Sequence, residues 1–226
     1  MSHGILSTVY GILKINMSDK KIPSIVIPRL SRYYRVLYEC GPDSWISSKQ
    51  LSESTGFSAA QIRRDLTYFG QFGIPGRGYN AEDLKKSIRS ILGLDKQWNV
   101  GLIGIGNLGR ALLGYRGFKE QGFNIIAAFD VDKSKVGRKI NNVTVYDMED
   151  IGKIFKENGI HIAIITVPEN VAQSVADKAV KAGVKAVLNF APAHLKLPPN
   201  VKQMHIDMTI EIERLSFLIS RDIERR

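Results

Sequence analysis

The sequence is poor in cysteine and in long apolar stretches. Its one cysteine, Cys40, cannot form an intramolecular disulfide, and a single thiol is typical of a protein kept reduced in a cytoplasm. No run of about 18 apolar residues is present, which excludes an integral membrane protein. The first 16 residues lack a small-residue cleavage site and do not form a convincing signal peptide.

The sequence also lacks the groupings that hold a metal ion or carry out a reaction. It has four histidines, and His161, His194 and His205 stand apart from any serine, cysteine or carboxylate constellation. A surface or hydrogen-bonded histidine is the simpler interpretation of each. No cluster of cysteine and histidine has the spacing of a metal site. We therefore expect neither a metal centre nor a catalytic site.

Length and charge indicate two domains and favour an anionic partner. The chain has 226 residues, enough for two small cores. A net charge of +10 fits a nucleic acid partner, although excess lysine on a solvated surface gives the same figure. A second methionine, Met17, makes the preceding segment an added or upstream stretch, and we expect residues 1–21 to be disordered.

The first half of the chain predicts a helix-turn-helix. From Pro28 we expect an amphipathic helix that ends before Gly41. Its apolar residues, at spacings of three and four, are Leu30, Tyr33, Tyr34, Leu37 and Tyr38. The pairs Ser47 with Gln50 and Ser58 with Gln61 each have the pattern of a capping box, which marks the start of a short helix. Two capped helices joined by a glycine-containing turn make a helix-turn-helix.

The second of these helices has an outward face that suits base reading. Ala60, Arg64 and Thr67 share this face, and apolar residues line the opposite one. A small residue lets the backbone approach the major groove, while glutamine and arginine supply donors to base edges and phosphates. A solvated face on a structural helical hairpin would show the same pattern.

A basic hairpin follows and favours DNA binding. The segment "FGIPGRGYN", residues 72–80, has three glycines and a proline around Arg77, which predicts a tight hairpin that projects this arginine like a wing. An ordinary surface turn is the alternative. A further capped helix is expected at 80–94 and a hinge at 95–98. The residues expected to contact DNA are Ser47, Ser48, Lys49, Ser58, Ala60, Gln61, Arg63, Arg64 and Arg77.

The second half opens with a glycine turn typical of dinucleotide sites. An apolar strand leads into the pattern G-x-G-x-x-G at Gly104, Gly106 and Gly109, where a helix begins. The first glycine makes the turn, the second lets the backbone approach a pyrophosphate, and the third packs the helix against the strand. The phosphates would lie at the helix N-terminus, next to Asn107 and Leu108.

The next apolar strand ends in Asp130. This residue lies 21 positions beyond Gly109, where an acidic residue binds the adenosine ribose. No arginine follows it directly, so a 2′-phosphate would be repelled and NAD(H) preferred over NADP(H). A simple turn carboxylate is the alternative.

The remaining alternation of strands and helices predicts a parallel sheet with right-handed crossovers. Apolar segments at 161–168 and 184–192 flank an alanine-rich helix at about 170–182. Ligands of such sheets bind at the carboxyl ends of the strands. The residues expected to line that crevice are Thr166, Val167, Pro168, Asn189, Phe190 and Ala191.

No segment remains for a substrate domain. Beyond the sheet there is one closing segment, residues 201–208, and one helix, residues 209–226. A dehydrogenase must also hold a substrate and move a proton. Two classes stay open: a ligand-sensing DNA-binding protein, and a small NAD-dependent oxidoreductase whose basic N-terminal module serves only for dimerisation or docking.

Several sequence blocks, in order, resemble the redox-sensing transcriptional repressors of the Rex family. The resemblance runs from about residue 22 to residue 223 and is more specific than any one glycine motif. The hairpin "IPGRG" departs from the commoner forms of that family. The blocks are "YYR" at 33–35, "SSKQL" at 47–51, "QIRRDLTYFGQFG" at 61–73, "GIGNLGRAL" at 104–112, "FDVD" at 129–132, "LNFAP" at 188–192 and "RLSF" at 214–217.

This resemblance implies a repressor rather than an enzyme. It implies a homodimer that binds a palindromic operator on double-stranded DNA, binds NADH or NAD⁺, and is released from DNA by NADH. It places redox sensing on Arg35, Tyr115 and Asp207, for which ordinary interdomain polar packing is the alternative. It also implies that the last helix swaps onto the partner, and the broad apolar face of that helix is compatible with this role.

The expected architecture is therefore α/β with three ordered parts. Residues 22–95 form a winged helix-turn-helix domain, residues 96–208 a Rossmann-type parallel sheet that binds NAD(H), and residues 209–226 a swapped dimerisation helix. The expected location is the cytoplasm. In this interpretation the dinucleotide is the signal and DNA binding is the output.

Overall fold

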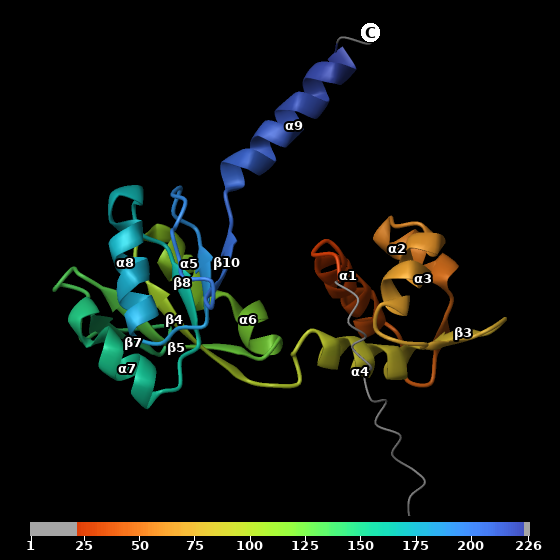
Figure 1. Ribbon diagram of the computed structural model, residues 1–226, viewed down its shortest axis with the longest axis horizontal. Coiled ribbons are helices and arrows are strands. Elements are labelled where there is room, and N and C mark those ends of the chain that lie inside the picture. Colours follow the sequence, from red (N-terminus) through yellow and green to blue (C-terminus); the bar gives the residue numbers. More distant parts are fainter. Residues whose placement is uncertain (1–21, 224–226) are drawn as a thin grey trace, which may run out of the picture. The chain divides into compact units, whose positions relative to one another are not determined.

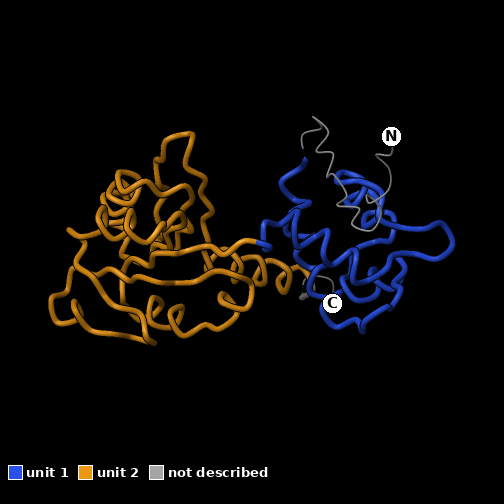
Figure 2. The backbone as a smooth tube through the Cα atoms, turned by 90° about the horizontal axis from the view of Figure 1, so that it is seen from below, with its two compact units in different colours: residues 1–95 blue, residues 96–226 orange. Residues whose placement is uncertain are grey.

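The computed structural model describes residues 22–223. The chain divides into two compact units, residues 1–95 and residues 96–226 (Figure 2). The disorder expected for residues 1–21 lies outside the described residues. Both helices and parallel strands are present, which is the α/β class that the sequence predicts.

Residues 22–95 form four helices and a small antiparallel sheet (Figure 1). The sheet has the strand order β1-β3-β2, and its second and third strands form the expected hairpin. The elements are α1 (Val26–Tyr38), β1 (Trp45–Ile46), α2 (Ser48–Thr55), α3 (Ala59–Thr67), β2 (Gly73–Ile74), β3 (Gly78–Asn80) and α4 (Ala81–Ile91).

The first helix differs from its prediction at both ends. It begins at Val26, so Pro28 lies in the first turn, where a backbone N–H has no partner within the helix and its loss costs little. Tyr38 was expected on the apolar face, but its side chain is 58% exposed because it lies at the helix end. The buried face of α1 consists of Val26, Leu30, Tyr33, Tyr34 and Leu37.

Residues 96–223 are built on a seven-stranded sheet with the order β10-β9-β8-β4-β5-β7-β6. All neighbouring strands pair in parallel except β6, which pairs antiparallel with β7 at one edge. The strands are β4 (Trp98–Ile103), β5 (Phe123–Asp130), β6 (Lys139–Ile140), β7 (Val143–Asp147), β8 (Ile162–Ile165), β9 (Ala186–Asn189) and β10 (Lys202–His205).

Helices cover both faces of this sheet (Figure 1). Residues of α7 and α8 share one apolar cluster with the sheet, and residues of α5 and α6 pack against a second. The helices are α5 (Asn107–Gly114), α6 (Arg116–Glu120), α7 (Ile151–Glu157), α8 (Glu169–Lys181) and α9 (Met208–Ile223), with a 3₁₀ turn at Met148–Asp150. The helices α6 and α7 were not predicted from the sequence, and neither were the edge strand β6 and its neighbour β7.

The strand order reverses direction at β4, and this reversal locates the ligand crevice. From β4 the chain proceeds to β5 and β7 on one side, and then to β8, β9 and β10 on the other. The connections that leave the carboxyl ends of β4 and β8 therefore lead away from each other. Open parallel sheets bind their ligands in the gap that this divergence leaves.

Candidate nucleic-acid interface and nucleotide crevice

The helix-turn-helix is capped only partly as predicted. At α2 the Ser47 hydroxyl accepts a hydrogen bond from the Gln50 amide at 3.1 Å, and the Gln50 side-chain oxygen accepts from the Ser47 amide at 2.8 Å, which completes a capping box. At α3 the Ser58 hydroxyl accepts from the Gln61 amide at 3.2 Å, but the Gln61 side chain donates to Asp65 instead. The prediction of a second capping box was therefore half wrong.

A buried carboxylate joins α3 to α1. Asp65, 1% exposed, accepts two hydrogen bonds from Arg29, at 2.6 and 2.7 Å, and one from the Tyr33 hydroxyl at 2.7 Å. Burial raises the pKa of the Asp65 carboxyl, but hydrogen bonds from Arg29, Tyr33 and Gln61 outweigh burial and hold that pKa below its usual value. This network was not predicted from the sequence. The signal that could have indicated it is an acidic residue beside the apolar face of α3.

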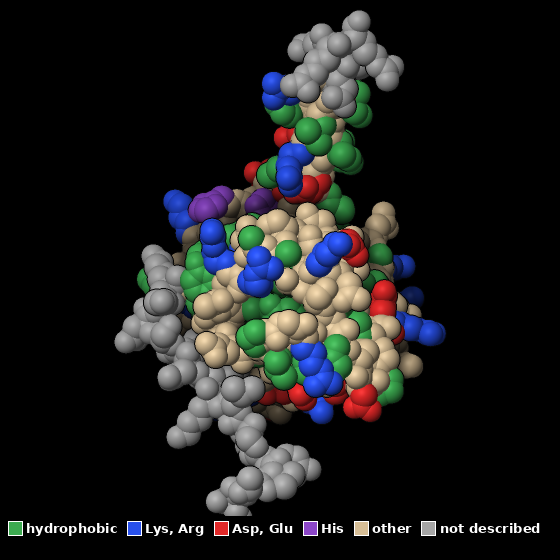
Figure 3. Space-filling model, turned by 90° about the vertical axis from the view of Figure 1, so that its right-hand side faces the viewer, with side chains coloured by type: hydrophobic (Ala, Val, Ile, Leu, Met, Phe, Trp, Pro, Cys, Tyr) green, Lys and Arg blue, Asp and Glu red, His purple; other side chains and the backbone are tan. Residues whose placement is uncertain are grey.

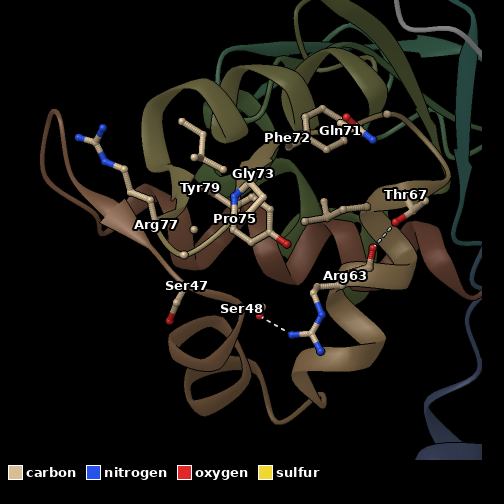
Figure 4. A pocket seen from close by; sticks show the side chains of 15 residues that line it. Ser47, Ser48, Arg63, Thr67, Gln71, Phe72, Gly73, Pro75, Arg77 and Tyr79 are labelled. Atoms are coloured by element: carbon tan, nitrogen blue, oxygen red, sulfur yellow. Dashed lines mark hydrogen bonds between the residues drawn. The ribbon is translucent and has the colours of Figure 1, made fainter.

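A hollow of about 590 Å³ lies between α3 and the β2–β3 hairpin (Figure 4). Ser47, Ser48, Arg63 and Arg77 line it, so it brings together four of the predicted DNA contacts. Arg63 donates from Nη1 to the Ser48 hydroxyl at 2.8 Å, which ties α3 to the start of α2 (Figure 4). Arg63 and Ser48 thus meet on one side of the hollow, and the Arg77 side chain is directed away from them (Figure 4).

The other predicted DNA contacts lie outside this hollow. Lys49, Ala60 and Arg64 are exposed on α2 and α3, and within the described part of the chain Arg64 forms no ion pair. The Ser58 hydroxyl caps α3, and the Gln61 side chain is directed inward to Asp65. Arg64 is therefore free to contact a ligand, whereas Gln61 has to leave its carboxylate first.

The hairpin arginine, Arg77, was predicted to project freely. In the structure its side chain instead lies over an aromatic ring. Its guanidinium carbon lies 3.8 Å from the centroid of the Trp45 ring. The attraction between a cation and an aromatic face accounts for this position. Arg77 is nevertheless exposed to solvent.

The glycine turn after β4 has the geometry for which each glycine is needed. Gly104 has a φ of +95°, and a Cβ at this position would lie 2.7 Å from the Thr166 carbonyl oxygen. A Cβ on Gly109 would collide with the Gly104 carbonyl, because α5 packs directly on the turn. A Cβ on Gly106 would meet open space, so its backbone is accessible. This cradle fits a pyrophosphate at the start of α5.

Asp130 ends β5 beside this turn and is held as a charged carboxylate. It accepts hydrogen bonds from the amides of Ile105 and Asp132, at 2.8 and 2.9 Å, and from the Lys135 ammonium at 3.0 Å. Burial raises the pKa of the Asp130 carboxyl, but the two amides and Lys135 outweigh burial and hold it below its usual value. Lys135 was not predicted from the sequence, and it places a cation where only negative charge was expected.

The crevice itself has a volume of about 400 Å³ and opens at the carboxyl ends of β4, β5 and β8. Its lining includes Gly104, Gly106 and Asp130 from the first half of the sheet, and Thr166, Val167 and Pro168 after β8. The Thr166 hydroxyl donates to the Gly104 carbonyl at 2.7 Å and so fixes the turn from the side. The crevice combines apolar walls with a few fixed polar groups, as small-molecule sites do.

The residues at the end of β9 lie outside the lining of this crevice. Asn189 is 2% exposed, and its amide nitrogen donates to the carbonyls of Ala191 and Ala193, at 3.1 and 2.8 Å. Its amide oxygen accepts from the Ala191 amide at 2.9 Å. Asn189, Phe190 and Ala191 are not among the residues that line the crevice. The Asn189 side chain therefore holds its own loop.

The three residues assigned to redox sensing are each placed within their own unit. Arg35 is exposed on α1. Tyr115 follows α5, is 60% exposed and meets the Phe118 ring edge to face at 5.1 Å. Asp207 accepts from the Thr209 amide at 2.9 Å immediately before α9.

The last helix leaves its apolar side chains open to solvent in the single chain (Figure 3). Each of the large apolar residues of its described part is half exposed or more. A soluble protein rarely leaves so many apolar residues uncovered without a partner. They are Met208, Ile210, Ile212, Leu215, Phe217, Leu218 and Ile219.

Residues 22–223 contain neither a metal-binding cluster nor a membrane-spanning helix. No group of three or more histidine, cysteine, aspartate or glutamate side chains in this range could hold a metal ion. Of the helices that the structure describes, none has the length and apolar character needed to cross a membrane.

Two family models match the chain, one in each unit. Residues 21–67 match the model described as "Putative DNA-binding protein N-terminus", and residues 95–193 match the model "CoA binding domain". The first covers α1 to α3, and the second covers the sheet from β4 to β9.

Curated relatives match over almost the whole chain. The redox-sensing transcriptional repressor Rex of Thermosipho africanus (strain TCF52B) is 45% identical over 209 residues, which cover 91% of this chain and 100% of the relative. Rex of Carboxydothermus hydrogenoformans shows the same identity and coverage.

Solved structures agree with these relatives. The crystal structure of RSP in complex with beta-NAD+ and operator DNA is 41% identical, has a TM-score of 0.85, and matches over 90% of this chain and 95% of that one. The complex of RSP with beta-NADH is 39% identical with a TM-score of 0.80, over 89% and 95% of the two chains. A third structure, described as RSP, a Rex-family repressor, is 38% identical with a TM-score of 0.80, over 90% and 96%.

Proposed function

Because the chain belongs to the Rex family of redox-sensing transcriptional repressors, we propose that it binds a palindromic operator as a homodimer and leaves it when NADH is bound. The resemblance of its sequence blocks to that family is confirmed. Like its relatives, the protein is a DNA-binding repressor and not an enzyme. The rival interpretation, a small NAD-dependent oxidoreductase, has no support among them.

The observation that carries the proposal is that one chain contains both sites. The first unit has a capped helix pair with an arginine-lined hollow, and the second has a glycine cradle beside a charged carboxylate. Two structures of RSP, at 41% and 39% identity, are named for complexes with beta-NAD+ and operator DNA and with beta-NADH. A ligand site and a DNA site on one chain make a ligand-controlled DNA-binding protein.

On the DNA side, α3 is the recognition helix and lies in the major groove. Exposed Arg64 supplies donors to base edges or phosphates, and Ala60 lets the helix backbone approach the bases. Arg63 and Ser48 act as a pair at the edge of the hollow. Ser47, Lys49, Ser58, Gln61 and Arg77 complete the proposed contact set.

On the ligand side, the turn at Gly104 and Gly106 holds the pyrophosphate, with the amides of Asn107, Leu108 and Gly109 at the start of α5. Asp130 accepts from the ribose hydroxyls. Thr166, Val167, Pro168, Asn189, Phe190 and Ala191 belong to the proposed binding set, with Asn189 acting through its loop. The bound dinucleotide supplies a nicotinamide ring that is neutral when reduced and cationic when oxidised.

The sensing residues are Arg35, Tyr115 and Asp207. A carboxylate near the ring favours the cationic form of the ligand, and the hydrogen bonds it makes change when the ring is neutral. A homodimer with α9 seated on the partner would cover the open apolar side chains of that helix. The proposed site of action is the cytoplasm.

The test begins with operator selection from random duplexes, with and without NADH. Fluorescence anisotropy on the selected, labelled duplex then measures affinity with no ligand, with NADH and with NAD⁺. We expect NADH to weaken binding and NAD⁺ to permit it. Equal affinity in all three conditions would show that the nucleotide is not the signal. Turnover of carbonyl substrates with NADH would instead support an oxidoreductase.

A further inference from the structure

The hairpin arginine is stacked on an aromatic ring from the neighbouring strand. Arg77 Cζ lies 3.8 Å from the centroid of the Trp45 ring, well inside the limit of about 6 Å for a cation–π contact. The other arginines of this unit that lie over a ring are further away, with Arg32 at 5.4 Å and Arg29 at 6.0 Å from the Phe57 centroid. The Arg77 contact is therefore a close stack.

The backbone on both sides of this stack is fixed by the sequence. Pro75 and Gly76 occupy the two central positions of a type II turn, closed by a hydrogen bond of 3.0 Å from the Arg77 amide to the Ile74 carbonyl. Gly76 has the positive φ, +76°, that the second central position requires. The direction in which Arg77 leaves the hairpin is therefore set by the turn.

The strand that carries the tryptophan is placed just as closely. In the register of β1 with β3, Trp45 faces Asn80 and Ile46 faces Tyr79. Gly78 has a φ of +93°, and a Cβ there would lie 2.7 Å from the Ile46 carbonyl oxygen. Only glycine lets the hairpin approach β1 this closely, and this approach brings the guanidinium over the indole ring.

Stacking on a ring uses the flat face of a guanidinium and leaves its edge free. Arg29 donates hydrogen bonds from two of its nitrogens to Asp65, and Arg63 donates one to Ser48. By contrast, within the described residues the Arg77 side chain has no ion pair and no hydrogen bond. All of its N–H donors are available to an outside acceptor.

We propose that Trp45 is a positioning residue for DNA binding, which holds the Arg77 guanidinium at the rim of the hollow with its N–H edge open to a phosphate of the duplex. This inference rests on the proposed function. An arginine that is already held loses less side-chain freedom on binding, so the contact forms at lower entropic cost. A planar fork of donors suits a phosphate, which it can bind at two points.

The test uses the full chain, its selected operator and anisotropy titrations at several salt concentrations. Arg77→Ala should weaken binding and lower the salt slope by about one, because one phosphate contact is lost. Trp45→Leu should weaken binding about two- to fivefold, the scale of an exposed cation–π contact. In a chain that already carries Arg77→Ala, Trp45→Leu should cost nothing more. Trp45→Phe should restore most of the affinity, since it keeps an aromatic face.

An equal loss from Trp45→Leu in both backgrounds would overturn the positioning role, because a structural defect acts with or without Arg77. No loss from Trp45→Leu would overturn it as well. A lower melting temperature for Trp45→Leu would affect both backgrounds alike, so the difference between the two losses still separates positioning of Arg77 from a folding defect.

A second measurement does not depend on DNA. The chain has two tryptophans, so Trp98→Phe leaves Trp45 as the sole indole emitter. Adding Arg77→Ala should then change the emission and its quenching by acrylamide, because the ring loses its cover. Unchanged emission would mean that the stack does not exist in solution and would overturn the inference. A chain whose emission changes but which binds no duplex would instead contradict the proposed function.

Discussion

Arg29 and Asp65 form a two-point ion pair between the helices α1 and α3. The Nε–Oδ2 and Nη2–Oδ1 distances are 2.6 and 2.7 Å, and the two side chains are 13% and 1% exposed. Removing one partner of a pair so shielded from water is costly, because the remaining charge stays buried without its partner. The position of α3 therefore depends on this pair as well as on its apolar face.

Asp65→Ala should lower the free energy of unfolding of the first unit by about 3 kcal/mol, since it leaves Arg29 without a partner. Urea unfolding followed by circular dichroism measures this loss. Glu53→Ala, which removes an exposed acid from α2, is the matched control and should cost less than about 0.5 kcal/mol. A similar small effect for both variants would show that the buried pair does not stabilise the unit.

The contribution of Asp65 should disappear in acid. Its pKa is lower in the folded chain than in the unfolded chain, so the charged carboxylate stabilises the fold above about pH 4 and loses this effect as the pH falls through the folded value. The difference in unfolding free energy between the wild type and Asp65→Ala should therefore shrink towards low pH. Urea unfolding at a series of pH values tests this, and a constant difference would contradict it.

Asp130→Ala should weaken NADH binding about tenfold and relax discrimination against NADPH, because the acceptor of the ribose hydroxyls is lost while Lys135 stays. Isothermal titration with both nucleotides measures the two affinities. Asp132→Ala is the control, since Asp132 also lies near Lys135, at 3.5 Å, but its side chain is 45% exposed. Wild-type protein that binds NADPH as tightly as NADH would refute the role given to Asp130.

Arg64→Ala should cost about 1 to 3 kcal/mol of operator affinity if the arginine contacts a base, and should flatten the salt slope if it contacts a phosphate. Its side chain is exposed, so the fold should not change. Lys153→Ala, an exposed cation on α7 of the other unit, serves as the control in the same anisotropy titrations. Unchanged affinity in both Arg64→Ala and Arg63→Ala would remove α3 from the interface.

Asp207→Ala should uncouple the ligand from the DNA. Coupling between two sites is reciprocal. In the wild-type protein, operator DNA must therefore weaken NADH binding by the same free energy by which NADH weakens DNA binding, about 1 to 3 kcal/mol. Measuring NADH affinity with and without operator checks the reciprocity. A variant at Asp207 that still releases operator fully with NADH would show that this residue is not required for sensing.

The features that could be predicted from the sequence are those that depend on short, local patterns of residues. The cradle at Gly104, Gly106 and Gly109 was predicted because the three glycines stand close together in the chain, at the spacing typical of dinucleotide sites. Ser47 was identified as a cap because its partner, Gln50, is three residues away. Local spacing contains this information because helices and turns place such neighbours in contact.

The features that could not be predicted depend on contacts between distant segments. Asp65 pairs with Arg29 across 36 positions, and nothing in the periodicity of either helix specifies that partner. Trp45 lies under Arg77 only because β1 pairs with β3. Asn189 lies at a strand end, where contact with a ligand was expected. Its side-chain amide instead donates hydrogen bonds to carbonyls of its own loop.

The open apolar side chains of α9 have a consequence for how the protein is made. Among the described residues of a single chain nothing covers these side chains, so completion of the proposed fold requires a second copy. Folding and assembly then form a single equilibrium, in which apparent stability rises with protein concentration. The number of repressor molecules in a cell therefore helps to set repression, alongside the balance of NADH and NAD⁺.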